Sequence, residues 1–126
     1  MYKYSIRSLA KLEECAEPLK ILANEVIKRS EIDFGIICGK RSNEEQLKKF
    51  NLGLSKAKPG ESGHNFNPSR ALDFGIYVNG IYQNGDTKEE IFLYKKVNDL
   101  FYSVAKEFNI NLKKPLSWDL GHIELA

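Results

Sequence analysis

The chain contains only two histidines among its 126 residues, and an aspartate lies near each of them. His64 precedes Asp73, and Asp119 precedes His122. A catalytic zinc ion takes three protein ligands with nitrogen or carboxylate donors and keeps a fourth position open for water. His64, Asp73 and His122 would supply such a set. Asp119 would then be free to take a proton from water and pass it to a leaving amine, as metal-assisted amide hydrolysis requires.

Each of these residues also has an ordinary structural interpretation. A histidine in a loop is usually solvated, a histidine on a terminal strand is usually half-buried, and an aspartate in a strand can simply pair with a base. Arg41 follows a predicted strand and precedes a predicted helix, and such junctions often present functional side chains. It can equally form a surface ion pair with Glu44 or Glu45. Spacing alone leaves both interpretations open.

The predicted loop and strands are the elements that must position the candidate residues. Residues 54–70 are rich in Gly, Ser, Pro, Asn and Lys without periodicity, which predicts a long loop carrying His64. Residues 71–82 predict a β-hairpin turned at Asn79-Gly80. Residues 121–125 alternate apolar and polar side chains and predict a last short strand.

The remaining segments predict helices. Ser8 is expected to cap a short helical turn, and a longer helix is expected from Pro18 through Lys28. After the β-prone residues 34–38, a capping box of Ser42 and Glu45 predicts another helix. An apolar stripe predicts a long helix from Asp86 or Thr87 to about Asn109. Together the elements predict an α+β fold, a small antiparallel sheet with packed helices in a single compact domain over residues 1–126.

Composition excludes several classes of protein. A net charge of +2 with interspersed acids and bases gives little of the field that nucleic-acid binding needs, so no nucleic-acid partner is expected. No apolar run has the length of a membrane span, and residues 1–5 do not resemble a signal peptide, so no membrane insertion is expected. Cys15 and Cys38 lack metal-binding spacing and are expected to be buried small hydrophobes.

Four motifs resemble a known family from about Phe34 to the C-terminus. They are Gly39-Lys40-Arg41-Ser42 with Glu45-Gln46, Gly53-Leu54-Ser55-Lys56, Ser62-Gly63-His64 with Ala71-Leu72-Asp73-Phe74, and Trp118-Asp119-Leu120-Gly121-His122-Ile123-Glu124. In order and spacing they resemble the M15 metallopeptidases. That family includes D-Ala-D-Ala carboxypeptidases and dipeptidases, and the L-alanyl-D-glutamate endopeptidases that phages use as endolysins.

The resemblance implies roles for the candidate metal residues. The zinc ligands of the family correspond to His64, Asp73 and His122, and its catalytic carboxylate corresponds to Asp119. One feature departs from the family, because the connection from His64 to Asp73 is two residues longer than usual. A loop absorbs two extra residues at modest entropic cost, so both ligands are still expected to converge.

The resemblance also implies residues that contact substrate. Arg41 corresponds to the family's arginine, which would hold a substrate carboxylate or polarise the scissile carbonyl. Gln46 and Ser62 occupy motif positions and are expected to contribute to substrate binding. Trp118 is expected to be a core anchor, since a lone tryptophan usually is. Glu124 faces the same side of its strand as His122, and the sequence does not decide whether it supports that ligand or is merely exposed.

The resulting hypothesis is a zinc-dependent peptidase, acting as a monomer, that cuts peptidoglycan stem peptides. L-alanyl-D-glutamate cleavage is favoured, with D-Ala-D-Ala carboxypeptidase activity as an alternative. A second alternative is a non-catalytic cell-wall-binding module with a metal site. Similarity to the endolysin branch and the missing signal peptide predict that the protein stays in the cytoplasm of the host bacterium until lysis.

Overall fold

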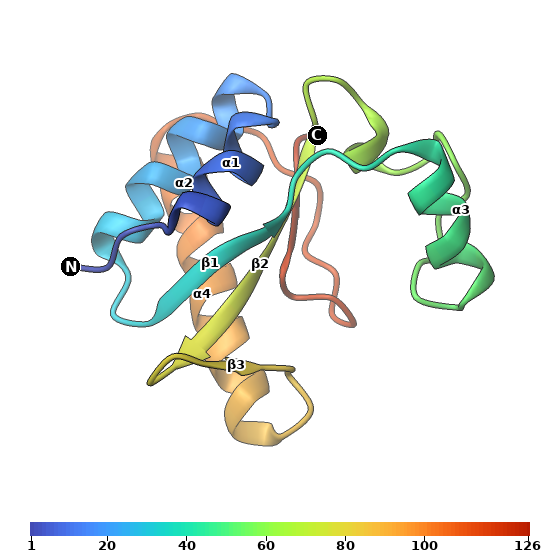
Figure 1. Cartoon of the computed structure of the whole chain (residues 1–126). Coiled ribbons are helices and arrows are strands. Elements are labelled where there is room, and N and C mark those ends of the chain that lie inside the picture. The colour runs from blue at the N-terminus through green and yellow to red at the C-terminus, as the bar shows by residue number, and fades with distance from the viewer.

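The strand β2 (Ala71–Val78) lies at the centre of a four-stranded antiparallel sheet. The computed structural model describes all 126 residues. Strand β1 (Asp33–Cys38) pairs along one edge of β2. The other edge is shared by β3 (Ile81–Gln83), which pairs with the end of β2, and β4 (His122–Glu124), which pairs with its beginning. Residues at the start of β2 therefore have neighbours on both sides (Figure 1).

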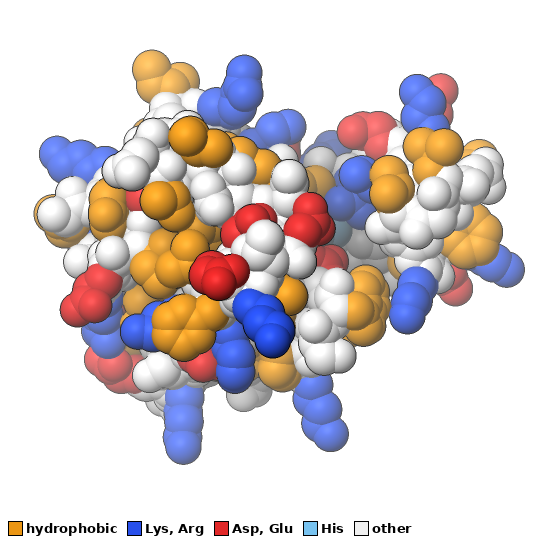
Figure 2. All heavy atoms as spheres, turned by 90° about the horizontal axis from the view of Figure 1, so that it is seen from below, with side chains coloured by type: hydrophobic (Ala, Val, Ile, Leu, Met, Phe, Trp, Pro, Cys, Tyr) orange, Lys and Arg blue, Asp and Glu red, His pale blue; other side chains and the backbone are white.

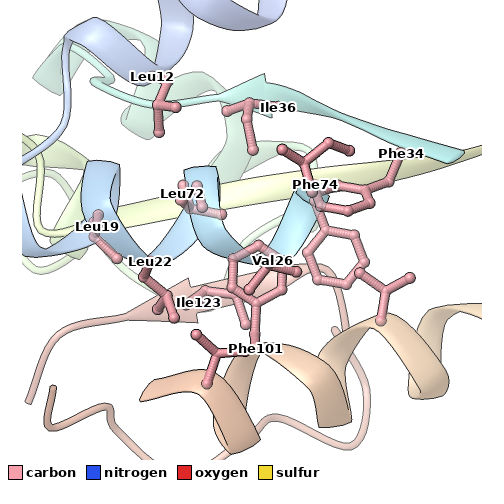
Figure 3. Packing of buried hydrophobic residues seen from close by; sticks show 14 of the residues in the cluster. Leu12, Leu19, Leu22, Val26, Phe34, Ile36, Leu72, Phe74, Phe101 and Ile123 are labelled. Atoms are coloured by element: carbon pink, nitrogen blue, oxygen red, sulfur yellow. The ribbon is translucent and has the colours of Figure 1, made fainter. Parts of the chain in front are cut away.

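Three helices cover this sheet and enclose the apolar core. They are α1 (Ile6–Glu13), α2 (Glu17–Arg29) and α4 (Lys88–Glu107). Side chains of all three helices interlock with those of the sheet (Figure 3). Phe101 of α4 stacks on Phe74 of β2, with ring centroids 5.3 Å apart. The predicted α+β class is confirmed. None of the helices is long and apolar enough to cross a bilayer.

The connection between β1 and β2, residues 39–70, is built differently, and we call it the arm. It carries α3 (Asn43–Asn51) and the 3-10 turn η1 (Gly63–Asn65), and α3 projects away from the other helices (Figure 1). No residue from 37 to 71 belongs to the apolar core cluster. The buried side chains of the arm are polar, namely Arg41, Gln46, Ser62, His64 and Ser69.

Local sequence signals determine where most elements begin and turn. The capping box of Ser42 and Glu45 opens α3, and Thr87 caps α4. Asn79 and Gly80 adopt left-handed φ angles of 51° and 78°, as a two-residue hairpin turn requires. The predicted cap at Ser8 is wrong, because Ser5 caps α1 instead.

Ser8 has a different role inside α1. Its side chain is buried, and its Oγ accepts a hydrogen bond from the backbone N–H of Ile36 at 3.0 Å. That N–H belongs to the edge strand β1, so Ser8 satisfies a buried donor that no neighbouring strand pairs.

Candidate metal centre and active site

The candidate metal ligands meet where β4 pairs with the start of β2. Asp73 and His122 are direct partners in the antiparallel register, which places their side chains beside each other. His64 comes from η1 in the arm, and its ring centroid lies 5.1 Å from that of His122. The Asp73 carboxylate lies between the two rings, with Oδ2 at 3.2 Å from His64 Nε2 and Oδ1 at 3.0 Å from His122 Nδ1.

The orientation of His64 is fixed by backbone groups of the arm. Its ring is 1% exposed, and Nδ1 lies 2.6 Å from the carbonyl oxygen of Gly39. Because a carbonyl only accepts, Nδ1 carries the proton and donates it there. The buried Nε2 has no well-aligned hydrogen-bond partner, although it approaches Asp73. Nε2 is therefore the nitrogen that is available to a metal.

The longer connection between His64 and Asp73 does not separate them. It ends at Ser69, which is fully buried and lies within hydrogen-bond distance of the carbonyl oxygens of Gly39, at 3.1 Å, and Ala71, at 2.7 Å. The backbone N–H of Arg70 also donates to the carbonyl of Gly63 at 3.0 Å. These bonds return the chain to the start of β2, and the extra length stays in the loop.

His122 is oriented by Glu124, two residues further along β4. The Nε2 of His122 lies 2.8 Å from a carboxylate oxygen of Glu124, which Lys113 holds from the other side at 2.7 Å. Nε2 donates to this carboxylate, which leaves Nδ1 facing Asp73. Gly63 makes room for this arrangement, since a Cβ on it would lie 2.7 Å from the Glu124 carboxyl carbon. Glu124 therefore supports His122, a role that the sequence left undecided.

The charges of the metal-free centre follow from this geometry. Burial opposes ionisation of Asp73, but the two imidazoles outweigh it and hold the pKa of Asp73 well below its usual range. Burial likewise opposes protonation of the histidines, but the Asp73 carboxylate raises the pKa of His64 to about 10 and that of His122 to about 9. The Asp73 carboxylate therefore favours positive charge at both rings, and a metal ion bound there would compete with protons for the same nitrogens.

Asp119 lies beside this centre, in a cluster with Asp73 and His122 that could itself hold a metal ion. Its carboxylate, the Asp73 carboxylate and a ring nitrogen of His122 all lie within 4.8 Å of one another. The backbone N–H of His122 donates to the carbonyl of Asp119 at 3.2 Å, so a tight turn holds the two residues together. Burial, together with the Asp73 charge, raises the pKa of Asp119. A raised pKa suits a carboxylate that takes up and releases a proton.

Arg41 and Gln46 form a buried pair next to the ligands. Nη1 of Arg41 donates to Oε1 of Gln46 at 2.7 Å, and Nη2 lies 3.4 Å from Oδ2 of Asp73. Arg41 forms no ion pair with Glu44 or Glu45. Gln46 is fully buried and its Nε2 donates to Ser55 Oγ and the Ala57 carbonyl, so its amide faces the arm and Arg41. Gln46 therefore positions Arg41 in this structure and has no polar atom directed at the cleft.

Ser62, Cys38 and Trp118 occupy positions that the sequence did not fully predict. Ser62 accepts a hydrogen bond from the backbone N–H of His64 and also lines the cleft. The expectation that Cys38 is a buried hydrophobe is wrong, because it is partly exposed and its Sγ lies 3.4 Å from Arg41 Nη2. A bulge between Ile36 and Cys38 changes the register there. Trp118 is 56% exposed and lines the cleft, so the expected core role is also wrong.

The donor set fits a divalent metal ion. Two imidazoles and one carboxylate converge, and each imidazole donates its outer N–H to a fixed oxygen, as ligating histidines do. His64 Nε2 is a buried nitrogen whose hydrogen bonding is unsatisfied. Three such ligands with an open position are typical of catalytic zinc. Two clusters could hold such an ion, Cys38 with His64 and Asp73, and Asp73 with Asp119 and His122, and both include Asp73.

Two pockets share Asp73, Trp118 and Asp119 and together form a cleft; one is lined by residues outside the arm, and the other lies between the arm and residues 113–124. One has a volume of about 400 Å³, and we call it the aromatic pocket, lined by Ile37, Phe74, Tyr82, Tyr94 and Trp118. The other has a volume of about 380 Å³, and we call it the basic pocket, lined by Arg41, Lys49, Lys56 and Lys113. Figure 2 shows the molecule hollowed between the arm and the rest, with histidine surface inside the hollow.

Comparisons with known proteins show the family and the fold of this chain. The family described as phage L-alanyl-D-glutamate peptidase matches residues 1–124. The crystal structure of the Serratia marcescens L-Ala D-Glu endopeptidase ChiX superposes with a TM-score of 0.80 at 21% identity, covering 98% of this chain and 90% of that chain, which shows a shared fold. No curated protein gave a significant match. The chain belongs to the phage L-alanyl-D-glutamate peptidase family and is an enzyme that acts on peptidoglycan.

Proposed function

We propose that this chain cleaves the L-alanyl-D-glutamate bond of peptidoglycan stem peptides with one Zn²⁺ held by His64, Asp73 and His122. The observation that carries the proposal is the arrangement of the two imidazoles. Each donates its outer N–H to a fixed oxygen and turns its other nitrogen toward the same carboxylate. Nitrogen and carboxylate donors in this number favour zinc over the harder cations magnesium and calcium, which prefer oxygen ligands.

The residues around the ligands would carry the proton and charge transfers. When bound, zinc supplies Lewis acidity, which polarises a carbonyl and favours ionisation of water. Asp119 takes the proton from the attacking water and delivers it to the leaving nitrogen of D-glutamate. Arg41, held by Gln46 beside Asp73, contributes positive charge where negative charge develops on the scissile carbonyl oxygen.

Digestion of purified peptidoglycan, with mass spectrometry of the released fragments, tests this function. We expect new amino termini on D-glutamate, their loss with a chelator, and their return with added zinc. Asp119→Asn should lower kcat by about 10²–10⁴-fold, because a positioned general base is lost while the three ligands remain. Asp99→Asn, which changes an exposed aspartate on α4, is the matched control and should retain activity.

Other fragment patterns would contradict the proposal. Release of terminal D-alanine alone would indicate a carboxypeptidase. Binding to wall material without any release, across several wall types in the presence of zinc, would indicate a non-catalytic module. Full activity of Asp119→Asn would remove Asp119 from the mechanism.

We also propose that the enzyme acts as a monomer and remains in the host cytoplasm until lysis. All the candidate ligands and Asp119 are supplied by one chain, so the proposed site needs no residue from a second copy. Membership in a phage family supports release at lysis. Sedimentation of the zinc-loaded protein and fractionation of infected cells before lysis test the two statements. A stable dimer, or protein in the wall fraction before lysis, would contradict them.

A further inference from the structure

The two pockets of the cleft differ in charge. Every lysine and arginine side chain that lines the cleft belongs to the basic pocket, and the aromatic pocket has none. Both pockets share Asp73, Trp118 and Asp119, so they meet at the proposed site of bond cleavage. A peptide that crosses Asp119 therefore meets uncharged aromatic surface on one side and cations on the other.

Two of the four cations form no ion pair within the protein. Lys113 is bonded to Glu124, and Arg41 lies against Asp73. Lys49 and Lys56 form no ion pair. The Nζ of Lys56 lies 4.6 Å from the centroid of the exposed Trp118 ring. The Lys56 side chain therefore extends from the arm toward the opposite wall of the cleft.

The basic pocket also contains four acidic residues, Glu61, Asp73, Asp119 and Glu124, and none of them forms an ion pair with Lys49 or Lys56. Asp73 is a candidate metal ligand, and Glu124 is shared by His122 and Lys113. Glu61 accepts a hydrogen bond from the backbone N–H of Lys58 at 2.6 Å, which holds its carboxylate at the outer loop. Lys49 and Lys56 thus remain as positive charges without an ion-pair partner on one wall of the cleft.

The backbone of the arm fixes where these two lysines lie. The carbonyl of Lys49 accepts hydrogen bonds from the N–H groups of Leu54 and Ser55, at 2.9 and 3.3 Å, which closes the turn after α3. Gln46 then binds Ser55 Oγ and the Ala57 carbonyl on either side of Lys56. These hydrogen bonds therefore hold the backbone of Lys56 on the same wall as Lys49, while neither ammonium group forms an ion pair.

The substrate bond has a matching asymmetry, if the proposed function holds. A glutamyl residue has two carboxyl groups, and only one can continue the peptide. A free carboxylate therefore remains within a few bonds of the scissile nitrogen, whereas the alanyl side has an uncharged methyl group. We infer that Lys49 and Lys56 bind this free carboxylate of D-glutamate, so that the stem peptide runs from the aromatic pocket, across Asp119, into the basic pocket.

This orientation makes Lys49 and Lys56 determinants of specificity. Charge complementarity at a cleft selects between partners of the same shape, and each solvent-accessible ion pair changes affinity severalfold. An enzyme with this arrangement should distinguish a glutamate carboxylate from the carboxamide that has the same shape and no charge. The leaving amine, which belongs to D-glutamate, would then face the basic side of Asp119.

Two synthetic stem peptides test the inference, one with a free D-glutamate carboxylate and one with a carboxamide in its place. We expect the zinc-loaded wild type to cleave the carboxylate peptide with a kcat/KM about tenfold higher, as two screened ion pairs allow. In Lys49→Gln/Lys56→Gln the ratio should fall to about one, mainly through a higher KM for the carboxylate peptide. Continued cleavage of the carboxamide peptide will show that this variant is folded.

Lys88→Gln/Lys106→Gln is the matched control, because it removes two exposed, unpaired lysines of α4 that line neither pocket. It has the same net charge as the test variant and should keep the wild-type ratio. Equal cleavage of both peptides by the wild type, or a preference that survives in Lys49→Gln/Lys56→Gln, would overturn the inference alone. Cleavage of neither peptide by the wild type would overturn the proposed function and the inference with it.

Discussion

The apolar body of the molecule and its arm stabilise their side chains by different means. In the body, α1, α2 and α4 pack on the sheet around a cluster of 19 buried hydrophobic residues. In the arm, residues 39–70, the buried side chains are polar and are held by hydrogen bonds. The candidate metal centre joins the two regions, since Asp73 and His122 lie on strands of the body and His64 lies in the arm.

The site therefore combines residues from a close-packed body with residues from a segment that has little apolar burial. Close-packed apolar contacts hold β2 and β4 in place, so Asp73 and His122 keep their spacing. The arm contributes Arg41 and the two free lysines from a segment with little apolar burial, and such segments open more easily. A metal bound to His64 would add a strong link between the arm and the body.

The largest effect should follow from truncating the body. Phe101 is fully buried, and its ring stacks on that of Phe74. Phe101→Ala should lower the free energy of unfolding by about 3–5 kcal/mol through lost burial and a cavity. Leu52→Ala in the arm removes a side chain that is 69% exposed and should change it by no more than about 0.5 kcal/mol. Denaturant unfolding measures the free energy of unfolding of both variants. Equal losses of stability would contradict the distinction between the apolar body and the arm.

Removing zinc should act on the arm more than on the body. Ligand binding at 100 times Kd stabilises the bound form by about 2.7 kcal/mol, which corresponds to about 100-fold in protection from exchange. Because His64 is the arm's contribution to the site, hydrogen exchange after chelation should speed up in residues 39–70 by up to this factor. Amides of β2 and α4 should change much less. Uniform acceleration along the chain would show that the arm and body open together.

Replacing Gln46 should produce a smaller effect that is confined to the arm. Gln46→Leu leaves Arg41 Nη1 and the Ala57 carbonyl without their buried partner, which costs about 1–3 kcal/mol. We expect faster local exchange around α3 and a lower kcat/KM, because Arg41 loses its support. Leu47→Gln, at the exposed neighbouring position, is the control and should retain both properties. An unchanged kcat/KM in Gln46→Leu would show that Arg41 needs no such support.

The sequence predicted features that depend on neighbouring residues. The capping box of Ser42 and Glu45, the hairpin turn at Asn79-Gly80 and the cap at Thr87 all form as predicted. Each depends on hydrogen bonds or φ angles within a few residues. The metal and proton-transfer candidates were found because their types and order in the chain resemble a family, and the structure brings His64, Asp73, His122 and Asp119 together.

Features that depend on distant contacts were not predictable from the chain alone. Cys38 turns toward Arg41 because of a bulge in β1, and no local signal marks that bulge. Gln46 has a motif position typical of substrate contact, but its burial depends on the return of the chain at Ala57. Trp118 is 56% exposed and lines both pockets, and its neighbours there come from distant segments, Ile37 and Phe74 on the strands and Lys56 in the arm.

Calorimetric titration of the metal-free protein with Zn²⁺, for the wild type and His64→Ala, tests the central claim most directly. The claim is that two body residues and one arm residue together hold a single catalytic zinc ion. We predict one tight site per chain in the wild type, and its loss in His64→Ala without loss of the folded body. Equal zinc affinity in the two proteins would contradict the claim, because the ion would then be bound without the arm.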